Sequence, residues 1–335
     1  MVRIAIDAMG GDYAPQPIID GALAAARHVG IGLTLVGDRS AIEPQLARHR
    51  DAGRLNIEIV EAAEAIGMAE SPAAAVRRKP QASIRVAAAV VARREAAALF
   101  SAGNTGATVM AAHAAFGMIA GVDRPALATT IPTRERPAVL VDVGANADCR
   151  PQHLVQFAVM GSVYARLALG VERPRVGLLS IGEEETKGND LTREAHRLLK
   201  AGPLAFIGNL EARDVYSGQA DVIVCDGFTG NITLKVSEGL VEMVEELLRE
   251  EFRARAGGVG ALFSRKAFRQ VRRRIDYSEY GGAPLLGVAG LCIVGHGRSS
   301  AKAVHNAGAM AARFAACGLV DRIGQEIAAT GVTHQ

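Results

Sequence analysis

Six stretches of the chain combine glycine with Asp, Asn, Ser or Thr, and each follows an apolar run typical of a buried β-strand. Glycine lets the backbone approach a ligand closely, and the N–H groups at a helix start point toward anions. A single stretch of this kind is usually a tight turn with a helix cap. Six of them at one edge of one sheet favour a shared pocket for a phosphate-like anion. The stretches are 7–12, 101–106, 142–146, 181–190, 226–231 and 295–299.

Polar residues and glycines of these stretches are the candidate substrate- and phosphate-binding groups. They are Asp7, Gly10, Gly11, Ser101, Gly103, Asn104, Thr105, Gly106, Asn146, Gly182, Asp226, Gly227, Gly230 and His296. Because a bare carboxylate repels phosphate, we expect Asp7, Asp142 and Asp226 to hold the loops in place. Lys187 lies in the fourth stretch, where its ammonium group either holds a phosphate or pairs with the glutamates at 183–185.

The elements that would position these loops alternate along the chain. We expect strands at 2–7, 33–37, 55–60, 97–101, 139–143, 176–181, 205–207 and 222–225. We expect helices at 17–29, 41–50, 83–94, 105–119, 153–169, 231–255 and 299–317. This alternation predicts an α/β fold in three layers, with helices on both faces of a mostly parallel sheet. No linker or repeat divides the chain, so residues 1–335 are expected to form one domain.

Composition limits the class of protein. With 335 residues, 49% hydrophobic and 22% charged, the chain is expected to fold rather than stay disordered. A net charge of +3 is too balanced for a nucleic-acid-binding protein. The motifs GxxxxGK[ST] and GxGxxG are missing from the sequence, which disfavours nucleotide-dependent enzymes. Four widely spaced cysteines without a CxxC pair predict no metal site, and we expect no cofactor.

Two apolar stretches bear on export and membrane insertion. The run at 1–12 is too short for a signal peptide, and Asp7 interrupts it. The stretch at 96–122 carries no charge before Asp123, but polar residues and glycines break it. It therefore predicts a buried strand, a loop and a helix rather than a membrane span. We expect a cytoplasmic protein, either free or peripherally attached to a membrane.

A strongly basic segment stands apart from the loops. Residues 249–276 hold nine basic and three acidic side chains, a net charge of +6 against +3 for the whole chain. The glycine-rich centre at 257–263 predicts a turn, so we expect a protruding basic helical hairpin at 240–278. The hairpin is either a solvated hairpin at a dimer interface or a surface that binds an acidic protein or anionic lipid. The contact residues would be Arg253, Arg255, Leu262, Phe263, Arg265, Lys266, Arg269, Arg272, Arg273 and Arg274.

Ten motifs spread over essentially the whole chain resemble the bacterial phosphate acyltransferases of fatty acid and phospholipid synthesis, the PlsX family. They are DAMGGD (7–12), AVRRK (75–79), SAGNTGA (101–107), DVGAN (142–146), HLVQFAVMGSVYA (153–165), VGLLSIGEEETKGND (176–190), IGNLEARD (207–214), DGFTGNITLK (226–235), YGGAPLLG (280–287) and HGRSSAKAV (296–304). The resemblance implies a homodimer with the fold shared by phosphotransacetylase and the isocitrate/isopropylmalate dehydrogenase group.

The same resemblance implies a reaction. A long-chain fatty acyl group would pass from acyl carrier protein to inorganic phosphate, reversibly forming acyl-phosphate. A membrane glycerol-3-phosphate acyltransferase would then use the acyl-phosphate for phosphatidic acid and phospholipid synthesis. Matching positions imply that Lys187 holds phosphate and that Asn231 contacts phosphate or the oxyanion. His296 would be either an acid for the leaving thiol or a structural histidine.

Three other functions stay open at this point. One is a phosphate acyltransferase of the phosphotransacetylase type that uses coenzyme A. Another is a dehydrogenase of the same broad fold. The third is a non-catalytic membrane scaffold built around the basic hairpin, against which the six glycine-rich loops argue.

Overall fold

A computed structural model of the chain describes residues 1–254 and 281–331. Within these residues, eleven strands form one sheet in the order β3-β2-β1-β4-β11-β10-β5-β6-β9-β7-β8. The strands are β1 (Arg3–Asp7), β2 (Gly32–Gly37), β3 (Ile57–Glu61), β4 (Ala98–Ser101), β5 (Ala126–Ile131), β6 (Ala138–Val141), β7 (Arg175–Leu179), β8 (Ala205–Leu210), β9 (Val222–Val224), β10 (Ala283–Leu286) and β11 (Leu291–Val294).

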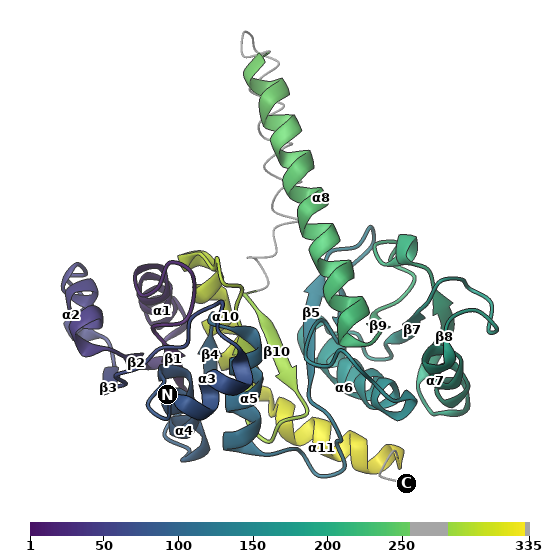
Figure 1. The fold of residues 1–335 in the computed structure, drawn as a ribbon, viewed down its shortest axis with the longest axis horizontal. Coiled ribbons are helices and arrows are strands. Elements are labelled where there is room, and N and C mark those ends of the chain that lie inside the picture. The colour runs from purple at the N-terminus through teal and green to yellow at the C-terminus, as the bar shows by residue number, and fades with distance from the viewer. Residues whose placement is uncertain (255–280, 332–335) are drawn as a thin grey trace.

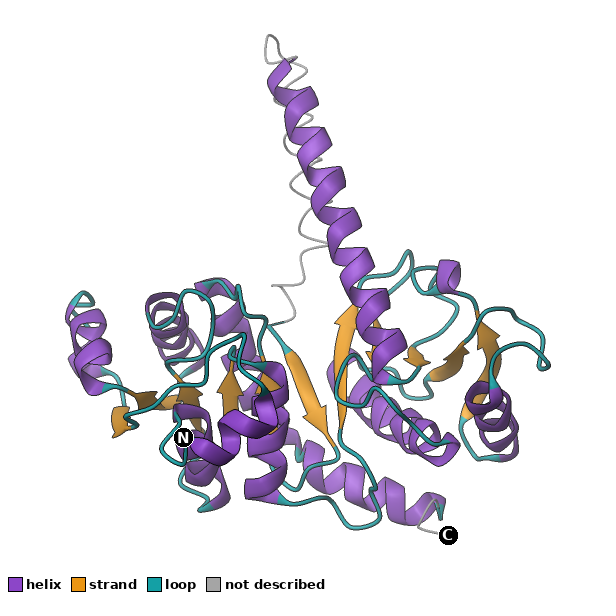
Figure 2. Cartoon of the chain, viewed as in Figure 1, coloured by secondary structure: helices purple, strands orange, loops and turns teal. Residues whose placement is uncertain are grey.

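Helices cover this sheet on both sides (Figure 2). They are α1 (Gln16–Val29), α2 (Arg39–Ala47), α3 (Pro72–Arg78), α4 (Ser83–Ala92), α5 (Thr105–Phe116), α6 (Pro151–Leu169), α7 (Asp190–Ala201), α8 (Gly227–Ala254), α10 (Ala301–Cys317) and α11 (Leu319–Thr330), with short 3-10 turns at Ala52–Arg54 and Ala212–Asp214. Figure 1 shows the two halves that the sheet joins and the long helix α8 rising between them.

The strands separate two hydrophobic clusters. Ile4 and Ile6 of β1 enter a cluster with α1, α6, α10 and α11, whereas Ala5 between them enters a cluster with α4 and α5. Successive side chains of a strand point to opposite faces, so each strand contributes to both clusters. A strand that is buried on both faces is expected to be apolar along its whole length, and most strands of this sheet are apolar runs in the sequence. The predicted three-layer α/β fold is confirmed.

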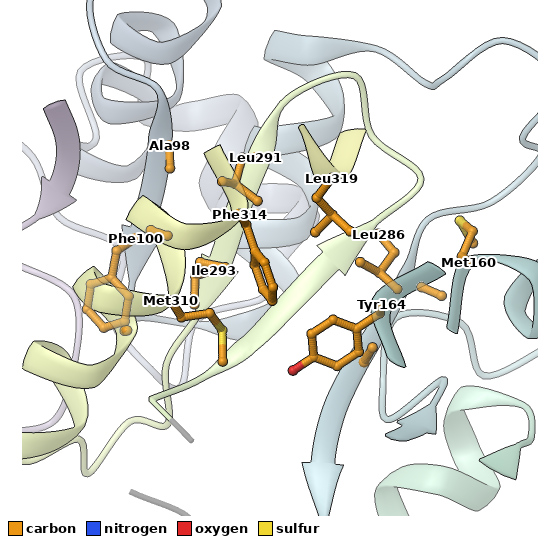
Figure 3. Close-up of a cluster of buried hydrophobic side chains, with 14 of the residues drawn as sticks. Ala98, Phe100, Met160, Tyr164, Leu286, Leu291, Ile293, Met310, Phe314 and Leu319 are labelled. Carbon is orange, nitrogen blue, oxygen red and sulfur yellow. The ribbon is translucent and has the colours of Figure 1, made fainter. Parts of the chain in front are cut away.

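Large side chains of the first cluster bridge the two halves (Figure 3). Tyr164 of α6 and Phe314 of α10 meet edge to face, with ring centroids 5.4 Å apart. Such a pair contributes about 0.5–1.5 kcal/mol beyond the area it buries. The sheet and this shared cluster therefore hold the halves together, which supports the proposal of one domain over residues 1–335.

Helices α1 and α10 approach each other closely because glycine lies at their contact. A Cβ atom on Gly21 would lie 2.5 Å from Cβ of Val304, and one on Gly308 would lie 2.8 Å from Cβ of Ala25. Neither separation leaves room for a methyl group, so the spacing of these helices depends on both glycines. In this way the beginning and the end of the chain form one helix layer.

Two antiparallel strands reverse the direction of the sheet. β10 is antiparallel to both β11 and β5, and β5 is antiparallel to β6. Strands β1, β4 and β11 therefore run opposite to β6, β7 and β9 within the sheet. The prediction that all six loops share one sheet edge is wrong. Three of the loops follow β1, β4 and β11, and the other three follow β6, β7 and β9, which run in the opposite direction. The predicted mostly parallel sheet is nevertheless present.

Helix α8 begins where β9 ends and spans 28 residues, which at 1.5 Å per residue is about 42 Å. Figure 1 shows that it projects well beyond the body of the molecule. The hairpin predicted at 240–278 begins within this helix, but 255–280 lie outside the described residues, so the hairpin stays a prediction. Of the helices in the described ranges, none has the length and apolar character needed to cross a membrane.

Candidate active site

Asp142 organises the loop that follows β6. Its Oδ1 accepts N–H groups of Leu127, Gly144 and Ala145 at 3.0, 3.1 and 3.0 Å. Its Oδ2 accepts the backbone N–H and the side-chain Nδ2 of Asn146 at 2.8 and 2.9 Å. Burial raises the pKa of Asp142, while these hydrogen bonds act in the opposite direction. The carboxylate is thus fully used in holding the loop, as the sequence predicted.

Asn146 is equally committed to the loop. Its Nδ2 donates to the carbonyl of Pro125 at 2.6 Å in addition to Asp142. Its own carbonyl accepts the N–H of Gly227 at 2.7 Å. The structure therefore places Asn146 between the loop after β6 and the start of α8, where it acts on structure rather than offering its amide to a ligand.

The start of α8 packs against the Asp142 loop without space for side chains. A Cβ on Gly227 would lie 2.6 Å from the carbonyl oxygen of Asn146, and one on Gly230 would collide with the carbonyl oxygen of Asp142. Asp226 caps this turn, because its carboxylate accepts the N–H and the hydroxyl of Thr229 at 2.9 and 2.7 Å. Of these predicted binding residues, the two glycines permit contact between loops, and Asp226 is a helix cap.

Asn231 is exposed one residue beyond this tight contact. Its Nδ2 donates to the carbonyl of Val143 at 3.1 Å, which fixes the orientation of the amide. The nitrogen keeps a second hydrogen, and the carboxamide oxygen accepts no hydrogen bond from the described residues. Asn231 can therefore present an oriented donor to a phosphate or to an oxyanion.

Lys187 lies in the loop after β7, the strand that pairs with β9. Its backbone N–H donates to the carbonyl of Glu184 at 3.0 Å, and its side chain is exposed. Within residues 1–254 and 281–331, its ammonium group forms no ion pair. Glu185 pairs instead with Lys200, so the predicted alternative of a lysine neutralised by this glutamate is wrong.

The other group of loops meets at Asp7. Ser101 donates its hydroxyl to Asp7 Oδ2 at 2.7 Å and accepts the N–H of Gly103 at 3.1 Å. A Cβ on Gly10 would lie 2.6 Å from that carboxylate oxygen. Burial raises the pKa of Asp7, with hydrogen bonds from Ser83 and Ser101 opposing the change. A small pocket opens here, lined by Asp7, Met9, Gly10, Ile66, Ser83, Ile84, Ser101, Gly103, Asn104, Ala107 and Thr108.

Asn104 has a structural task in this group. It caps α5 by accepting the N–H of Ala107 at 3.1 Å, and its Nδ2 donates to the carbonyls of Met68 and Glu70 at 3.1 and 3.0 Å. Gly106 accommodates Pro72, whose Cγ would lie 2.6 Å from a Cβ there. Among the predicted residues of this loop, only Thr105 has an exposed side chain.

Helix α8 connects the two groups of loops. The N–H of Arg298 donates to His296 Nδ1 at 3.1 Å, and Nζ of Lys235 lies 3.2 Å from His296 Nε2. Arg298 also pairs with Glu242 at 3.0 Å, and the backbone of Gly297 accepts the N–H of Asp12 at 2.8 Å. Lys235 lies one helical turn beyond Asn231, so the loops after β1 and β11 reach the helix that starts at the other group.

His296 is held by these contacts rather than exposed for proton transfer. Burial, followed by the positive charge of Lys235, lowers the pKa of His296, so the ring is neutral near pH 7. A neutral imidazole is a weak acid, which favours a structural role for His296 over a role as the acid for the leaving thiol.

The sequence did not reveal Lys235 or Ser83 as residues of the site, because neither lies in a stretch that directly follows a predicted strand. The predicted contact residues from Arg255 onward lie outside the described residues, and nothing is described of the Arg253 side chain.

The α/β fold that carries these two groups of loops is found in solved enzyme structures. Phosphotransacetylase from Streptococcus pyogenes superposes with a TM-score of 0.64 at 18% identity, with 94% of each chain covered. A branched-chain phosphotransacylase from Enterococcus faecalis gives a TM-score of 0.58 at 14% identity, with 94% of this chain and 99% of that chain covered. The fold is therefore that of the phosphotransacetylases, as predicted.

Sequence comparison narrows the class. The family model described as "Fatty acid synthesis protein" matches residues 2–322. A phosphate acyltransferase of Acidobacterium capsulatum is 52% identical over 335 residues, covering 100% of this chain and 99% of that protein. One of Geotalea uraniireducens is 49% identical over 327 residues, covering 97% and 94%. The chain belongs to this family, the phosphate acyltransferases of fatty acid and phospholipid synthesis, and the predicted membership is confirmed.

Proposed function

We propose that this protein transfers a long-chain fatty acyl group from acyl carrier protein to inorganic phosphate, forming acyl-phosphate reversibly. Family membership supports phosphate as the acceptor. The observation that carries the proposal within the site is the exposed Lys187 ammonium group, which no carboxylate of the described residues neutralises. An ammonium group of this kind suits a phosphate dianion as a point charge.

The reaction needs no nucleophilic side chain, because phosphate supplies the attacking oxygen. That oxygen forms a bond to the thioester carbonyl carbon, and the tetrahedral intermediate then breaks the carbon–sulfur bond. A proton from phosphate or solvent ends on the carrier thiol. We assign Lys187 to phosphate and Asn231, oriented by Val143, to phosphate or the developing oxyanion. The buried aspartates hold the loops, which keeps their negative charge away from phosphate.

Acyl carrier protein is the proposed donor, and coenzyme A is the alternative. The fold is shared with phosphotransacetylases at 18% identity or less, which supports the fold alone. The basic segment at 249–276 favours an acidic protein donor, because opposite charge steers association. Acyl-phosphate made in the cytoplasm would pass to a membrane glycerol-3-phosphate acyltransferase. Peripheral attachment through the same basic segment would shorten that transfer.

A homodimer is the proposed assembly. An exposed apolar row winds along α8 with spacings of three or four residues, comprising Phe228, Ile232, Val236, Leu240, Val244 and Leu247. Val236 is 65% exposed and Leu240 is 55% exposed, which is costly for a helix that stands in water. The same row on a second copy would cover it, as apolar helix faces do in coiled coils.

The test is a direct assay with both donors. Purified protein is incubated with palmitoyl-acyl carrier protein and phosphate, and acyl-phosphate is trapped with hydroxylamine and measured. A parallel reaction contains palmitoyl-coenzyme A. Phosphate-dependent product from the carrier protein, with little from coenzyme A, is expected. Product from coenzyme A alone would transfer the protein to the phosphotransacetylase type, and a folded sample without product from either would refute the proposal.

A further inference from the structure

A buried side chain of β8 is hydrogen-bonded to the turn that carries Lys187. Nδ2 of Asn209 donates to the carbonyl of Glu184 at 2.9 Å. The same carbonyl accepts the backbone N–H of Lys187 at 3.0 Å. The Glu184 carbonyl oxygen therefore links Asn209 to the turn at 184–187. Asn209, which lies outside this loop, holds that oxygen in place.

The Glu184 carbonyl fixes which way the Asn209 amide faces, and His196 of α7 holds the oxygen of that amide from the other side. A carbonyl can only accept, so the nitrogen of Asn209 must face Glu184 and its oxygen must face His196. His196 Nδ1 lies 2.9 Å from that oxygen and must therefore carry a proton. His196 and Asn209 are 5% and 6% exposed. Reversing the amide would place the Asn209 oxygen against the Glu184 carbonyl oxygen and the Asn209 NH2 group against the His196 N–H, and neither arrangement forms a hydrogen bond.

The ring of His196 is itself fixed by its neighbours. It packs edge to face on Phe206, with ring centroids 5.0 Å apart. Its Nε2 lies 3.7 Å from Oε1 of Glu185, and Lys200 pairs with the same oxygen. Glu184 and Glu185 are thus both held, the first by its carbonyl and the second by its carboxylate, just ahead of Lys187.

We propose that Asn209, held by His196, is a positioning residue that fixes the direction of the Lys187 side chain. The inference rests on the proposed role of Lys187 in holding phosphate. Lys187 is exposed and its ammonium group is unpaired in the described part of the chain, so its own contacts do not fix its direction. Gly182 leaves space for the stem of Lys187, since a Cβ at Gly182 would lie 2.8 Å from Lys187 Cγ. A displacement of about 1 Å at such a group can lower the rate about a hundredfold.

Asn209→Asp isolates the hydrogen bond to Glu184. The two side chains have the same shape, and Asp still accepts from His196, but it cannot donate to the Glu184 carbonyl. The KM for phosphate should rise about tenfold, while the KM for the acyl donor changes less than about twofold. His196→Asn, which carries an amide at the place of Nδ1, should stay near wild type. His196→Leu, which cannot donate, should behave like Asn209→Asp.

Hydrogen exchange gives a readout that does not depend on catalysis. The Lys187 amide should exchange about tenfold faster in Asn209→Asp, because its acceptor is no longer held. Thr130→Val is the matched control, since it removes a buried hydrogen bond of 2.8 Å to Tyr164 far from this loop. It should alter neither the Lys187 amide nor the KM for phosphate.

A double variant separates failure of the inference from failure of the proposed function. If Asn209 acts through Lys187, adding Asn209→Asp to Lys187→Met should cost nothing further. Unchanged exchange at Lys187 and an unchanged KM for phosphate in Asn209→Asp would overturn the inference while the function stands. A normal Lys187→Met enzyme would remove the role of Lys187. A rise in KM from Asn209→Asp that persists in the Lys187→Met background would show that Asn209 does not act through Lys187.

Discussion

The side chain of Lys187 passes directly over Gly182, so that a Cβ on Gly182 would lie 2.8 Å from Lys187 Cγ. Gly182 is buried at the start of the loop, whereas Lys187 is exposed near its end. The loop therefore folds back on itself, so that the stem of Lys187 lies against Gly182. This relationship gives a glycine from the sequence motif a physical purpose, which is to make space for the stem of the proposed phosphate-binding residue.

Replacing Lys187 by methionine should lower kcat/KM by one or more orders of magnitude without unfolding the protein. Methionine keeps much of the stem over Gly182 but removes the charge that would hold phosphate. Arg197→Met is a suitable control, because Arg197 is an exposed residue of α7 that pairs only with nearby Glu194 among the described residues. Steady-state kinetics with varied phosphate checks this, and near-normal turnover in Lys187→Met would exclude Lys187 from the mechanism.

Gly230→Ala should destabilise the protein by about 1–3 kcal/mol, because the new methyl group collides with the Asp142 carbonyl oxygen. Gly239→Ala on the same helix is the matched control, since no atom of the described residues lies within 4 Å of its Cβ position. That variant should be stabilised by up to about 1 kcal/mol through helix propensity. Chemical denaturation measures both, and equal stabilities would contradict the close packing of α8 on the Asp142 loop.

The free energy of unfolding should fall as the pH drops below about 6.5. Burial lowers the pKa of His153, whose Nδ1 accepts the N–H of Arg150 at 3.0 Å, and burial also lowers the pKa of His296. A histidine in the unfolded chain has a pKa of about 6.5. Below that pH the unfolded chain binds more protons than the folded chain at these two histidines. Their contribution to the free energy of unfolding is therefore fully present above about pH 6.5 and is lost as the pH falls further.

His153→Asn tests the contribution of that side chain to the pH dependence. Asn can still accept the Arg150 N–H but does not titrate, so the loss of stability between pH 7 and about 5.5 should become smaller. Thermal unfolding of both proteins across this range measures the difference. Parallel curves would mean that His153 does not titrate differently in the two states.

Charge on the apolar row of α8 should prevent dimer formation. Val236→Glu combined with Leu240→Glu places two carboxylates on the face that would meet a second copy, where they would repel each other and resist burial. Glu246→Gln, an exposed change on the same helix, should leave the assembly intact. Light scattering after size exclusion gives the molar mass, and a dimer that survives the double change would place the interface elsewhere.

Charge reversal at Arg272, Arg273 and Arg274 should raise the KM for palmitoyl-acyl carrier protein at least several-fold and make it less dependent on salt. The KM for phosphate should not change. This prediction rests on the sequence, because these residues lie outside the described ranges. Unchanged kinetics together with unchanged binding to anionic liposomes would leave the segment as a solvated surface.

Much of the fold could be predicted because local pattern and final structure agree. The strands at 3–7, 98–101 and 138–141 are apolar runs followed by polar loops, and each proved to be a buried strand. Strands β5 and β10 were not predicted, and β11 was implied only by the apolar run ahead of the loop at 295–299. β10 is only four residues long and contains Pro284, which a strand pattern disfavours. Since β5 and β10 reverse the sheet, missing them produced the wrong expectation of a single loop edge.

The roles of single site residues depended on distant partners. Asn104 and Asn146 were predicted as ligand donors from their loops, but carbonyls at Met68, Glu70 and Pro125 occupy their amides. Those carbonyls are far away in the sequence, and no local pattern reveals them. The partnership of His196 with Asn209 was hidden for the same reason, since it depends on α7 folding back along β8.

The close packing of α1 on α10 has a consequence for how the protein is made. Helix α1 leaves the ribosome early, but α10, the partner that covers its apolar face, begins only at Ala301. At about 5–20 residues per second, the delay is on the order of tens of seconds. The second half waits as well, because Tyr164 of α6 packs against Phe314 of α10. The apolar face of α1 therefore stays uncovered until synthesis is almost complete, and this lengthens the period in which the nascent chain can aggregate.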